Sequence, residues 1–152
     1  MQPRRARPDD VPALVGLRAQ MFTSMGTDPS DPLWRANAER WFAERIDDPS
    51  HCMLVLELDG QVVCGGTAMI RDAAPSPGVP QGRDIVISNI CTLPPYRGRG
   101  CARRVFDALL GWARSTGVTR VELYATADGR PMYEAAGFTE SRCPAMRCSI
   151  GS

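Results

Sequence analysis

Residues 95–104 read Pro-Tyr-Arg-Gly-Arg-Gly-Cys-Ala-Arg-Arg, and this turn decides how the chain folds. An apolar, strand-like run from Ile85 to Thr92 precedes the turn, and an amphipathic helical pattern from Val105 to Ala113 follows it. A strand that enters a helix through a glycine-rich turn gathers free backbone N–H groups and the positive end of the helix dipole at one point. The turn is therefore typical of a binding site for phosphate or pyrophosphate.

The glycine spacing excludes two common nucleotide-binding loops. A dinucleotide fingerprint requires a glycine where Arg103 stands, and a Walker loop requires a lysine, which this chain lacks. The remaining pattern, Arg97-x-x-Gly100-x-Ala102, resembles the [RQ]-x-x-G-x-[GA] acyl-CoA loop of the GNAT superfamily of N-acetyltransferases. The alternative is an arginine-rich surface turn that binds nothing in particular.

The order of the predicted elements extends this resemblance over the whole chain. We expect an α/β (α+β) GNAT fold in one domain, residues 1–152, with a mixed, mostly antiparallel sheet of six or seven strands flanked by four helices. The order is β-α-α-β-β-β-α-β-α-β(-β). In residue numbers it reads strand 4–7, helices 11–25 and 33–46, strands 52–58, 61–70 and 85–92, a helix to 115, strand 118–125, helix 129–136, and one or two strands from 138 to 150.

Two local features support these boundaries. Asp59-Gly60 is a strong hairpin signal, and Gly65-Gly66 inside the following strand predicts a bend or a close backbone approach. A second segment, from Asp128 to Phe138, is similar to the later GNAT motif in which an aromatic-containing helical turn ends in Gly-Phe. In that segment Gly137 is the expected left-handed C-cap.

The resemblance implies a CoA site made mainly of main chain. It assigns the pyrophosphate to a loop with Arg97 in its first position, followed by Gly98, Arg99, Gly100, Cys101, Ala102 and Arg103. It assigns the pantetheine arm to the strand end formed by Ile90, Cys91 and Thr92, beside which the sheet opens in the family. It also implies that Tyr133 protonates the departing thiolate, the alternative being a tyrosine that only fills the core.

No general base can be assigned from the sequence. Glu57, Asp59, Asp84 and Glu122 are candidates by type only, Ser88 and Asn89 are weak bases, and His51 stands at a strand entry remote from the expected thioester. We expect the acceptor site between the first two helices, their connection and the loop 73–82, lined in part by Met21, Phe22, Met25, Trp34, Trp41 and Phe42 where these are not core. Asp28 and Asp31 are either contacts for a cationic amine or helix caps.

Composition narrows the function classes. The chain has 152 residues, 43% hydrophobic and 23% charged, with a net charge of +1, which gives no general attraction to nucleic acid or membrane. No run is long enough to span a membrane, and no apolar run follows Met1 to Arg5 as in a secretory signal, so we expect a cytoplasmic protein. Six cysteines without C-x-x-C spacing and one histidine predict reduced, mostly buried thiols and no metal site.

The sequence therefore predicts an acetyl-CoA-dependent N-acetyltransferase that acts on a small amine by direct attack in a ternary complex. Cys91 is the alternative nucleophile, but it lacks a nearby His–carboxylate pair in the sequence. An acyl-CoA-binding sensor or inactive paralogue is the competing function. A nucleic-acid patch fits poorly, because the arginine cluster lacks interleaved aromatic residues. A homodimer is left open.

Overall fold

The computed structural model describes residues 1–151 and contains one five-stranded sheet in the order β1-β2-β3-β4-β5. The strands are β1 (Arg4–Arg5), β2 (His51–Leu58), β3 (Gln61–Arg71), β4 (Asp84–Thr92) and β5 (Val121–Leu123). Neighbouring strands from β1 to β4 are antiparallel, and β5 runs parallel to β4. The mixed, mostly antiparallel sheet confirms the predicted fold class.

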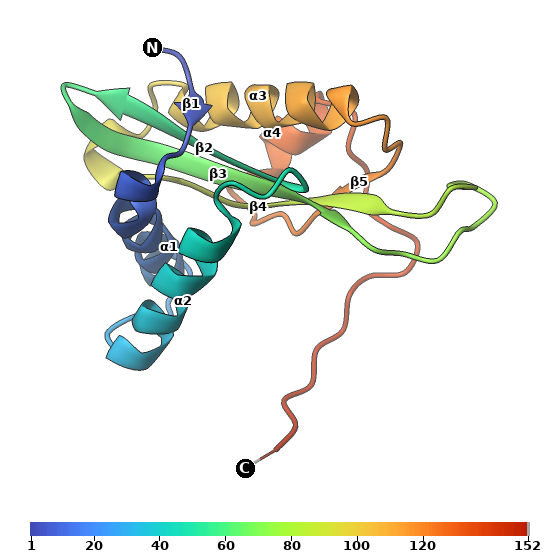
Figure 1. Cartoon of the computed structure of the whole chain (residues 1–152), viewed down its shortest axis with the longest axis horizontal. Helices are drawn as coiled ribbons and strands as arrows, with labels where there is room; N and C mark the ends of the chain where they lie inside the picture. Colours follow the sequence, from blue (N-terminus) through green and yellow to red (C-terminus); the bar gives the residue numbers. More distant parts are fainter. Residues whose placement is uncertain (152) are drawn as a thin grey trace.

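Four helices cover the two faces of this sheet (Figure 1). Helices α1 (Val11–Ser24) and α2 (Pro32–Arg45) lie on one face, and α3 (Cys101–Ser115) and α4 (Arg130–Ala135) lie on the other. Two short 3₁₀ turns, Pro8–Asp10 and Pro94–Tyr96, lead into α1 and toward α3. None of the helices in residues 1–151 is long and apolar enough to cross a membrane.

Strand β2 is apolar along most of its length because both of its faces are covered. Cys52, Leu54 and Leu56 belong to the core under α3, whereas Met53 and Val55 belong to the core under α1 and α2. Successive side chains of a strand point to opposite faces of the sheet, so a continuous apolar run supplies both cores. The chain thus forms two hydrophobic layers on one shared sheet.

The glycine pair in β3 lets helices approach the sheet from both sides. A Cβ on Gly65 would lie 3.0 Å from Leu17 Cδ1 of α1, and a Cβ on Gly66 would lie 2.9 Å from Val105 Cγ1 of α3. Real Cβ atoms essentially never lie as close as 2.9 Å to a neighbouring atom, and a contact at 3.0 Å is tighter than nine in ten of those that occur. The close backbone approach predicted for this pair is confirmed.

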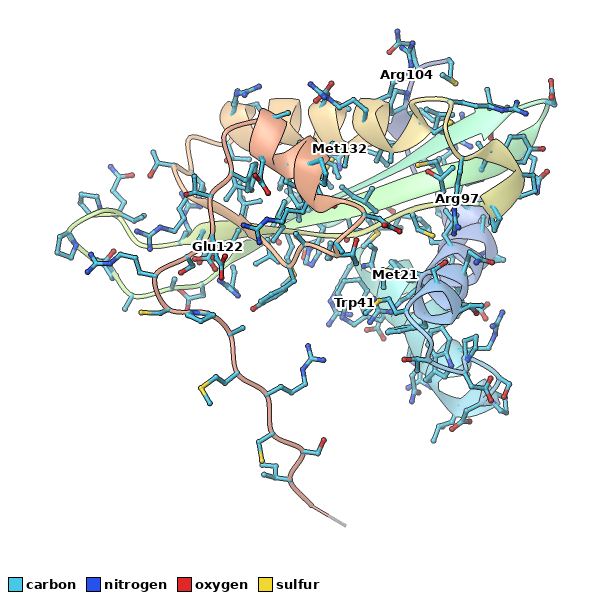
Figure 2. All side chains as sticks on the ribbon, turned by 180° about the vertical axis from the view of Figure 1, so that it is seen from behind. Met21, Trp41, Arg97, Arg104, Glu122 and Met132 are labelled. Carbon is cyan, nitrogen blue, oxygen red and sulfur yellow. The ribbon has the colours of Figure 1, made fainter. Side chains whose placement is uncertain are left out.

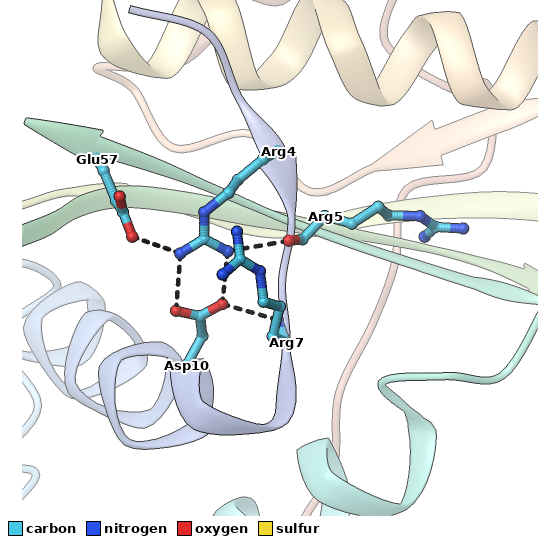
Figure 3. Close-up of polar contacts among 5 residues, drawn as sticks. All are labelled: Arg4, Arg5, Arg7, Asp10 and Glu57. Atoms are coloured by element: carbon cyan, nitrogen blue, oxygen red, sulfur yellow. Dashed lines mark hydrogen bonds and ion pairs between the residues drawn. The ribbon is translucent and has the colours of Figure 1, made fainter.

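An ion-pair cluster holds the N-terminus in place (Figure 3). Arg4 donates to both carboxylate oxygens of Asp10, at 2.7 and 3.1 Å, and also pairs with Glu57 of β2. The backbone N–H of Arg7 donates to the same Asp10 carboxylate at 2.7 Å. These donors hold the pKa of the buried Asp10 below its usual range, so the carboxylate stays ionised where it links β1, α1 and β2.

The expected strands after Phe138 do not form. Residues 138–151 contain no helix or strand, and the chain runs away from the body to its C-terminus (Figure 1). Phe138 packs against Phe106 of α3, but Met146 and Ile150 beyond it are almost fully exposed. The apolar side chains of this segment are not buried, so hydrophobic burial does not hold it against the sheet. Within residues 1–151 the sheet ends at the three-residue β5.

Candidate active site

Strand β4 contains a bulge where it pairs with β3. Gly65 of β3 pairs with Cys91 and Thr67 pairs with Ser88, so two residues, Asn89 and Ile90, stand opposite the single Gly66. Asn89 adopts the left-handed conformation, with φ of 59°. One extra residue in a strand bends it and re-aims its side chains.

The other edge of β4 is open beyond the bulge. Strand β5 pairs with β4 only from Ile85 to Ile87. Within residues 1–151, therefore, the segment from Ser88 to Thr92 has no strand on that side. The carbonyls at its two ends accept from side chains, that of Ser88 from Thr67 and that of Thr92 from Arg97, and between them lie Asn89, Ile90 and Cys91. An edge of this kind can pair with an extended ligand, and the pantetheine position at Ile90, Cys91 and Thr92 stays a prediction.

The loop after β4 presents an uncapped helix N-terminus. Gly98 and Gly100 are left-handed, with φ of 77° and 79°, and among the described residues no side chain caps the start of α3. No atom would lie within 4 Å of a Cβ placed on either glycine, so the space before the loop is open. The first N–H groups of a helix have no intrahelical acceptor, and here those of Cys101, Ala102 and Arg103 are in that position.

The arginines of this loop differ in what they contact. Arg97 turns back, donating through Nε to the carbonyl of Thr92 at 3.2 Å and through Nη2 to Ser24 Oγ of α1 at 2.9 Å. Arg99 stacks on the Tyr96 ring at 5.4 Å, and Arg103 pairs with Asp107 along the exposed face of α3. Figure 2 shows Arg97 directed toward α1 and Arg104 directed away from the body. Arg97 therefore joins β4 to α1, and Arg99 is the arginine that stays against the loop without an acidic partner among the described residues.

Three buried thiols, Cys64, Cys91 and Cys101, lie near the loop and the end of β4, and a fourth, Cys52, lies at the start of β2. All six cysteines are free, and Cys52, Cys64, Cys91 and Cys101 are buried. Burial raises the pKa of Cys91, and it raises that of Cys64 to about 11. These thiols stay protonated near neutral pH, and a protonated thiol is a poor nucleophile.

Tyr133 lies on α4 against the aromatic side chains that join α4 to α3. Its ring meets Phe106 edge-on at 5.1 Å and lies 6.3 Å from the Phe138 ring. The side chain is half-buried, and desolvation raises the pKa of the phenol, so the hydroxyl keeps its proton. The same packing would serve a tyrosine that only fills the core, so the chemical role of its hydroxyl stays a prediction.

A cavity of about 610 Å³ lies on the opposite face of the sheet, between α1, α2 and the bulge. Its wall is mostly apolar and aromatic, with polar side chains at the β4 end. The lining residues are Arg18 of α1, Trp34, Asn37, Ala38, Trp41 and Phe42 of α2, Met69 of β3, and Ser88 and Asn89 of β4. Of the residues expected to line an acceptor site, Trp34, Trp41 and Phe42 do so, whereas Met21, Phe22 and Met25 do not.

A chain of hydrogen bonds crosses the floor of this cavity. Arg18 donates to Asn89 Oδ1, Asn89 Nδ2 donates to Thr67 Oγ1 at 3.2 Å, and Thr67 Oγ1 lies 3.0 Å from Ser88 Oγ. Consecutive side chains of a regular strand point to opposite faces. Because of the bulge, Ser88 and Asn89 both face the cavity.

The carboxylates considered as bases are engaged elsewhere. Asp84 and Glu122 both pair with Arg71, at 2.7 and 3.1 Å, near the start of β4, and Glu57 pairs with Arg4. Asp59 occupies a left-handed turn position. In Figure 2, Glu122 and Arg97 lie well apart along the sheet.

His51 does not line the cavity. Its ring stacks edge-on against Trp41 at 5.8 Å, and its Nδ1 lies 3.5 Å from Asp48. Trp41 is itself a lining residue, so His51 stands one side chain behind the cavity wall. Among the residues that line the cavity, none is a histidine or a carboxylate.

Two other expectations about the acceptor site are decided by the structure. Asp31 is the N-cap of α2, accepting from the N–H of Leu33 at 2.8 Å, whereas Asp28 accepts hydrogen bonds from Ser30 in the turn before the helix and caps no helix. The loop 73–82 contributes no residue to the cavity, a correction to the predicted site, because β3 and β4 carry it beyond the end that α1 and α2 cover (Figure 1).

The sequence analysis missed Arg18 and Asn37 as site residues. Arg18 falls on the same helical face as Leu14, Val15 and Leu17, which are buried. An arginine within an apolar helical face is a signal that could have identified it, because buried charges are rare without a partner or a role. Asn37 carries no comparable signal.

Comparisons with known proteins agree with this fold. The model of the acetyltransferase (GNAT) family matches residues 13–138. An uncharacterized N-acetyltransferase of Mycobacterium tuberculosis is 33% identical over 82 residues, which are 54% of this chain and 47% of the relative, so the chain spans about half the length of the curated relatives it matches.

Two solved structures share the fold over nearly the whole chain. A predicted acetyltransferase with acetyl-CoA from Clostridium acetobutylicum superimposes with a TM-score of 0.87 at 24% identity, covering 97% of this chain and 95% of that one. A GCN5-related N-acetyltransferase from Ralstonia eutropha gives a TM-score of 0.83 at 24% identity, covering 97% of each chain. At this identity the likeness speaks to the fold alone.

Proposed function

The chain belongs to the acetyltransferase (GNAT) family, and from that membership we propose that it transfers an acetyl group from acetyl-CoA to the amine of a small molecule. The observation that carries the proposal is the uncapped N-terminus of α3 placed beside the open edge of β4. The helix N-terminus suits the pyrophosphate of CoA, and the open strand edge suits its extended, amide-containing pantetheine arm. The acetyl-CoA in the Clostridium acetobutylicum structure supports the same donor for this chain.

The loop residues fit a pyrophosphate well. Left-handed glycines at 98 and 100 aim consecutive N–H groups at open space, and the dipole of α3 adds positive potential there. Arg99, which lies over the Tyr96 ring beside the loop, supplies further positive charge near the same opening, whereas Arg103 is paired with Asp107. In this proposal the backbone N–H groups of Gly98 to Arg103 hold the pyrophosphate, and Arg97 fixes the loop against β4 and α1.

The proposed chemistry is a direct transfer. The neutral amine nitrogen attacks the thioester carbonyl carbon, a C–N bond forms, the C–S bond breaks, and the sulfur leaves as a thiolate that takes a proton. Tyr133 is the proposed donor, because its phenol is protonated at neutral pH. No acyl-cysteine is proposed, since the high pKa values of Cys91 and Cys64 leave these thiols protonated.

Removal of the amine proton is assigned to water. The residues that line the cavity include no carboxylate and no histidine, whereas Ser88, Asn89 and Thr67 form a hydrogen-bonded chain that can hold water beside the reacting nitrogen. Water is a sufficient proton acceptor when the amine is already partly neutral at the working pH.

The experiment that tests the proposal is a screen of primary amines with acetyl-CoA, following release of free thiol. Calorimetry with acetyl-CoA alone runs beside it. Binding together with thiol release on at least one amine supports an N-acetyltransferase. Saturable binding without thiol release on any amine favours the alternative function, an acyl-CoA-binding sensor, which the missing carboxylate base also suggests. No binding at all would refute both.

A further inference from the structure

The cavity between α1 and α2 contains an arginine without a counter-ion. Arg18 is partly buried, and desolvation alone lowers the pKa of its guanidinium. Among residues 1–151 it forms no ion pair, and its one hydrogen bond goes to the neutral amide oxygen of Asn89. Its other contact is the face of Phe22, 4.9 Å from the guanidinium carbon. Buried charges are usually paired.

The unused donors of Arg18 reach the cavity. A guanidinium carries five N–H groups, and Asn89 accepts from one nitrogen only. No buried side-chain nitrogen or oxygen in the described part of the chain lacks a hydrogen-bond partner, so the remaining nitrogens of Arg18 are accessible. The accessible space that Arg18 lines is the 610 Å³ cavity.

The rest of the cavity favours an anion with an apolar portion. None of its lining residues is acidic, so nothing there would neutralise Arg18 or attract a polycation. Trp34, Trp41 and Met69 provide an apolar wall opposite the polar end at Ser88 and Asn89. A planar guanidinium in a partly desolvated site matches the two oxygens of a carboxylate or phosphate.

We propose that the acceptor of this enzyme is a small amine that also carries a carboxylate or phosphate and that Arg18 binds this anionic group. The inference rests on the proposed acetyl transfer, because it places the acceptor in the cavity that adjoins the bulge of β4. Arg18 contacts Asn89, one residue before the segment predicted to hold the pantetheine arm, so the anion lies close to the reacting nitrogen. Amino acids and amino phosphates have this arrangement, and polyamines do not.

The test compares matched amines that differ only in the anionic group. L-phenylalanine is paired with its amide, and 2-aminoethyl phosphate with ethanolamine; the first pair reports on carboxylate and the second on phosphate. Acetylation of each is followed by thiol release with the wild-type protein, Arg18→Gln and Arg40→Gln. Arg40 is exposed on α2 and forms no ion pair among residues 1–151, so its substitution makes the same charge change away from the cavity.

We expect the wild type and Arg40→Gln to favour the anionic member of at least one pair by about tenfold or more in kcat/KM, as loss of one charge-assisted contact implies. In Arg18→Gln the two members of that pair should differ by less than about twofold. Equal or better use of the neutral members by the wild type would overturn the proposal even if Arg18→Gln fails to fold. An unchanged preference in a folded Arg18→Gln would overturn it as well.

Failure of the acetyl transfer itself would appear differently. If no amine in either pair releases thiol, the same pairs are titrated against the tryptophan fluorescence, to which Trp34 and Trp41 in the cavity wall and Trp112 of α3 contribute, at saturating acetyl-CoA. Tighter binding of the anionic member that is lost in Arg18→Gln would support the anion site while the proposed catalysis fails. Equal binding of both members, or binding of neither, would overturn the anion site.

Discussion

Replacement of Gly100 by valine separates the anion-binding role of the loop from its contribution to stability. Gly100 has φ of 79°, and an L residue in the left-handed region costs about 2 kcal/mol when β-branched. For a chain of this length that corresponds to a fall in Tm of roughly 4–8 °C. The same substitution places a side chain in the open space before the first N–H groups of α3.

Gly117 supplies a matched control at the other end of α3. Its φ is 78°, and as at Gly100 no atom lies within 4 Å of the position of a Cβ. Gly117→Val should therefore lower Tm by about the same amount as Gly100→Val. It stands far from the loop along the helix, so it should leave the affinity for acetyl-CoA unchanged.

The expected loss of affinity follows from the contacts that the valine at position 100 would block. Loss of one charge-assisted hydrogen bond costs about 1.5–3 kcal/mol, which raises Kd about tenfold to a hundredfold. Thermal unfolding measures the stability of both variants, and calorimetry with acetyl-CoA measures affinity. Wild-type affinity in a folded Gly100→Val would refute the assignment of the loop. Equal losses of affinity in both variants would mean that strain, not blocked donors, is the cause.

Three further outcomes are expected. Tyr133→Phe keeps the ring packing against α3 and removes the proton donor, so kcat should fall by about tenfold or more with little change in the KM for acetyl-CoA; an unchanged kcat removes Tyr133 from the mechanism. Gly66→Ala should destabilise the fold by about 1–3 kcal/mol in denaturant unfolding, because its Cβ meets three side chains at 2.9–3.0 Å. Gly111→Ala, inside α3 with nothing within 4 Å, should instead stabilise it by about 0.5–1 kcal/mol; destabilisation by both would refute the packing argument. The pKa of Asp10 is lowered in the fold, so its contribution to stability is present above the unfolded value of about 3.9 and is lost as pH falls through the lower folded value. The difference in Tm between wild type and Asp10→Asn should therefore shrink below about pH 4, and a constant difference would contradict the role of the Arg4 pair.

Local sequence patterns were sufficient for most of the fold. The Asp59-Gly60 turn predicts the hairpin of β2 and β3, and the spacing of buried residues in α3 predicts that helix, because each pattern depends on neighbours along the chain. The strands expected after Phe138 are wrong. Whether that segment pairs with the sheet depends on a face that can bury Met146 and Ile150, and no local pattern reports such a face.

The sequence predicted the part of the candidate site that consists of backbone groups, but not the part that consists of side chains from several elements. Glycines at 98 and 100 indicate the loop, since glycine tolerates the left-handed conformation that both positions adopt. The cavity between α1 and α2 depends instead on side chains from α1, α2, β3 and β4, brought together by packing. Arg18 lines this cavity together with residues of α2, and no pattern along α1 alone reports where α2 packs.

The β4 bulge couples the two halves of the site, and Gly66 is the residue that permits it. In a regular strand Asn89 would follow Ile87 onto the face under α3, among apolar side chains, where its amide would lack partners. The extra residue instead returns Asn89 to the cavity and sends Ile90 to the α3 side, where a Cβ on Gly66 would lie 3.0 Å from Ile90 Cγ1. A side chain at position 66 would therefore displace Ile90. That displacement would disturb the bulge, which places Asn89 within hydrogen-bonding distance of Arg18. The register shift at Gly66 thus determines both the packing under α3 and the polar side chains that face the cavity. We therefore expect that a core substitution on the α3 face of the sheet alters acceptor binding in the cavity on the other face.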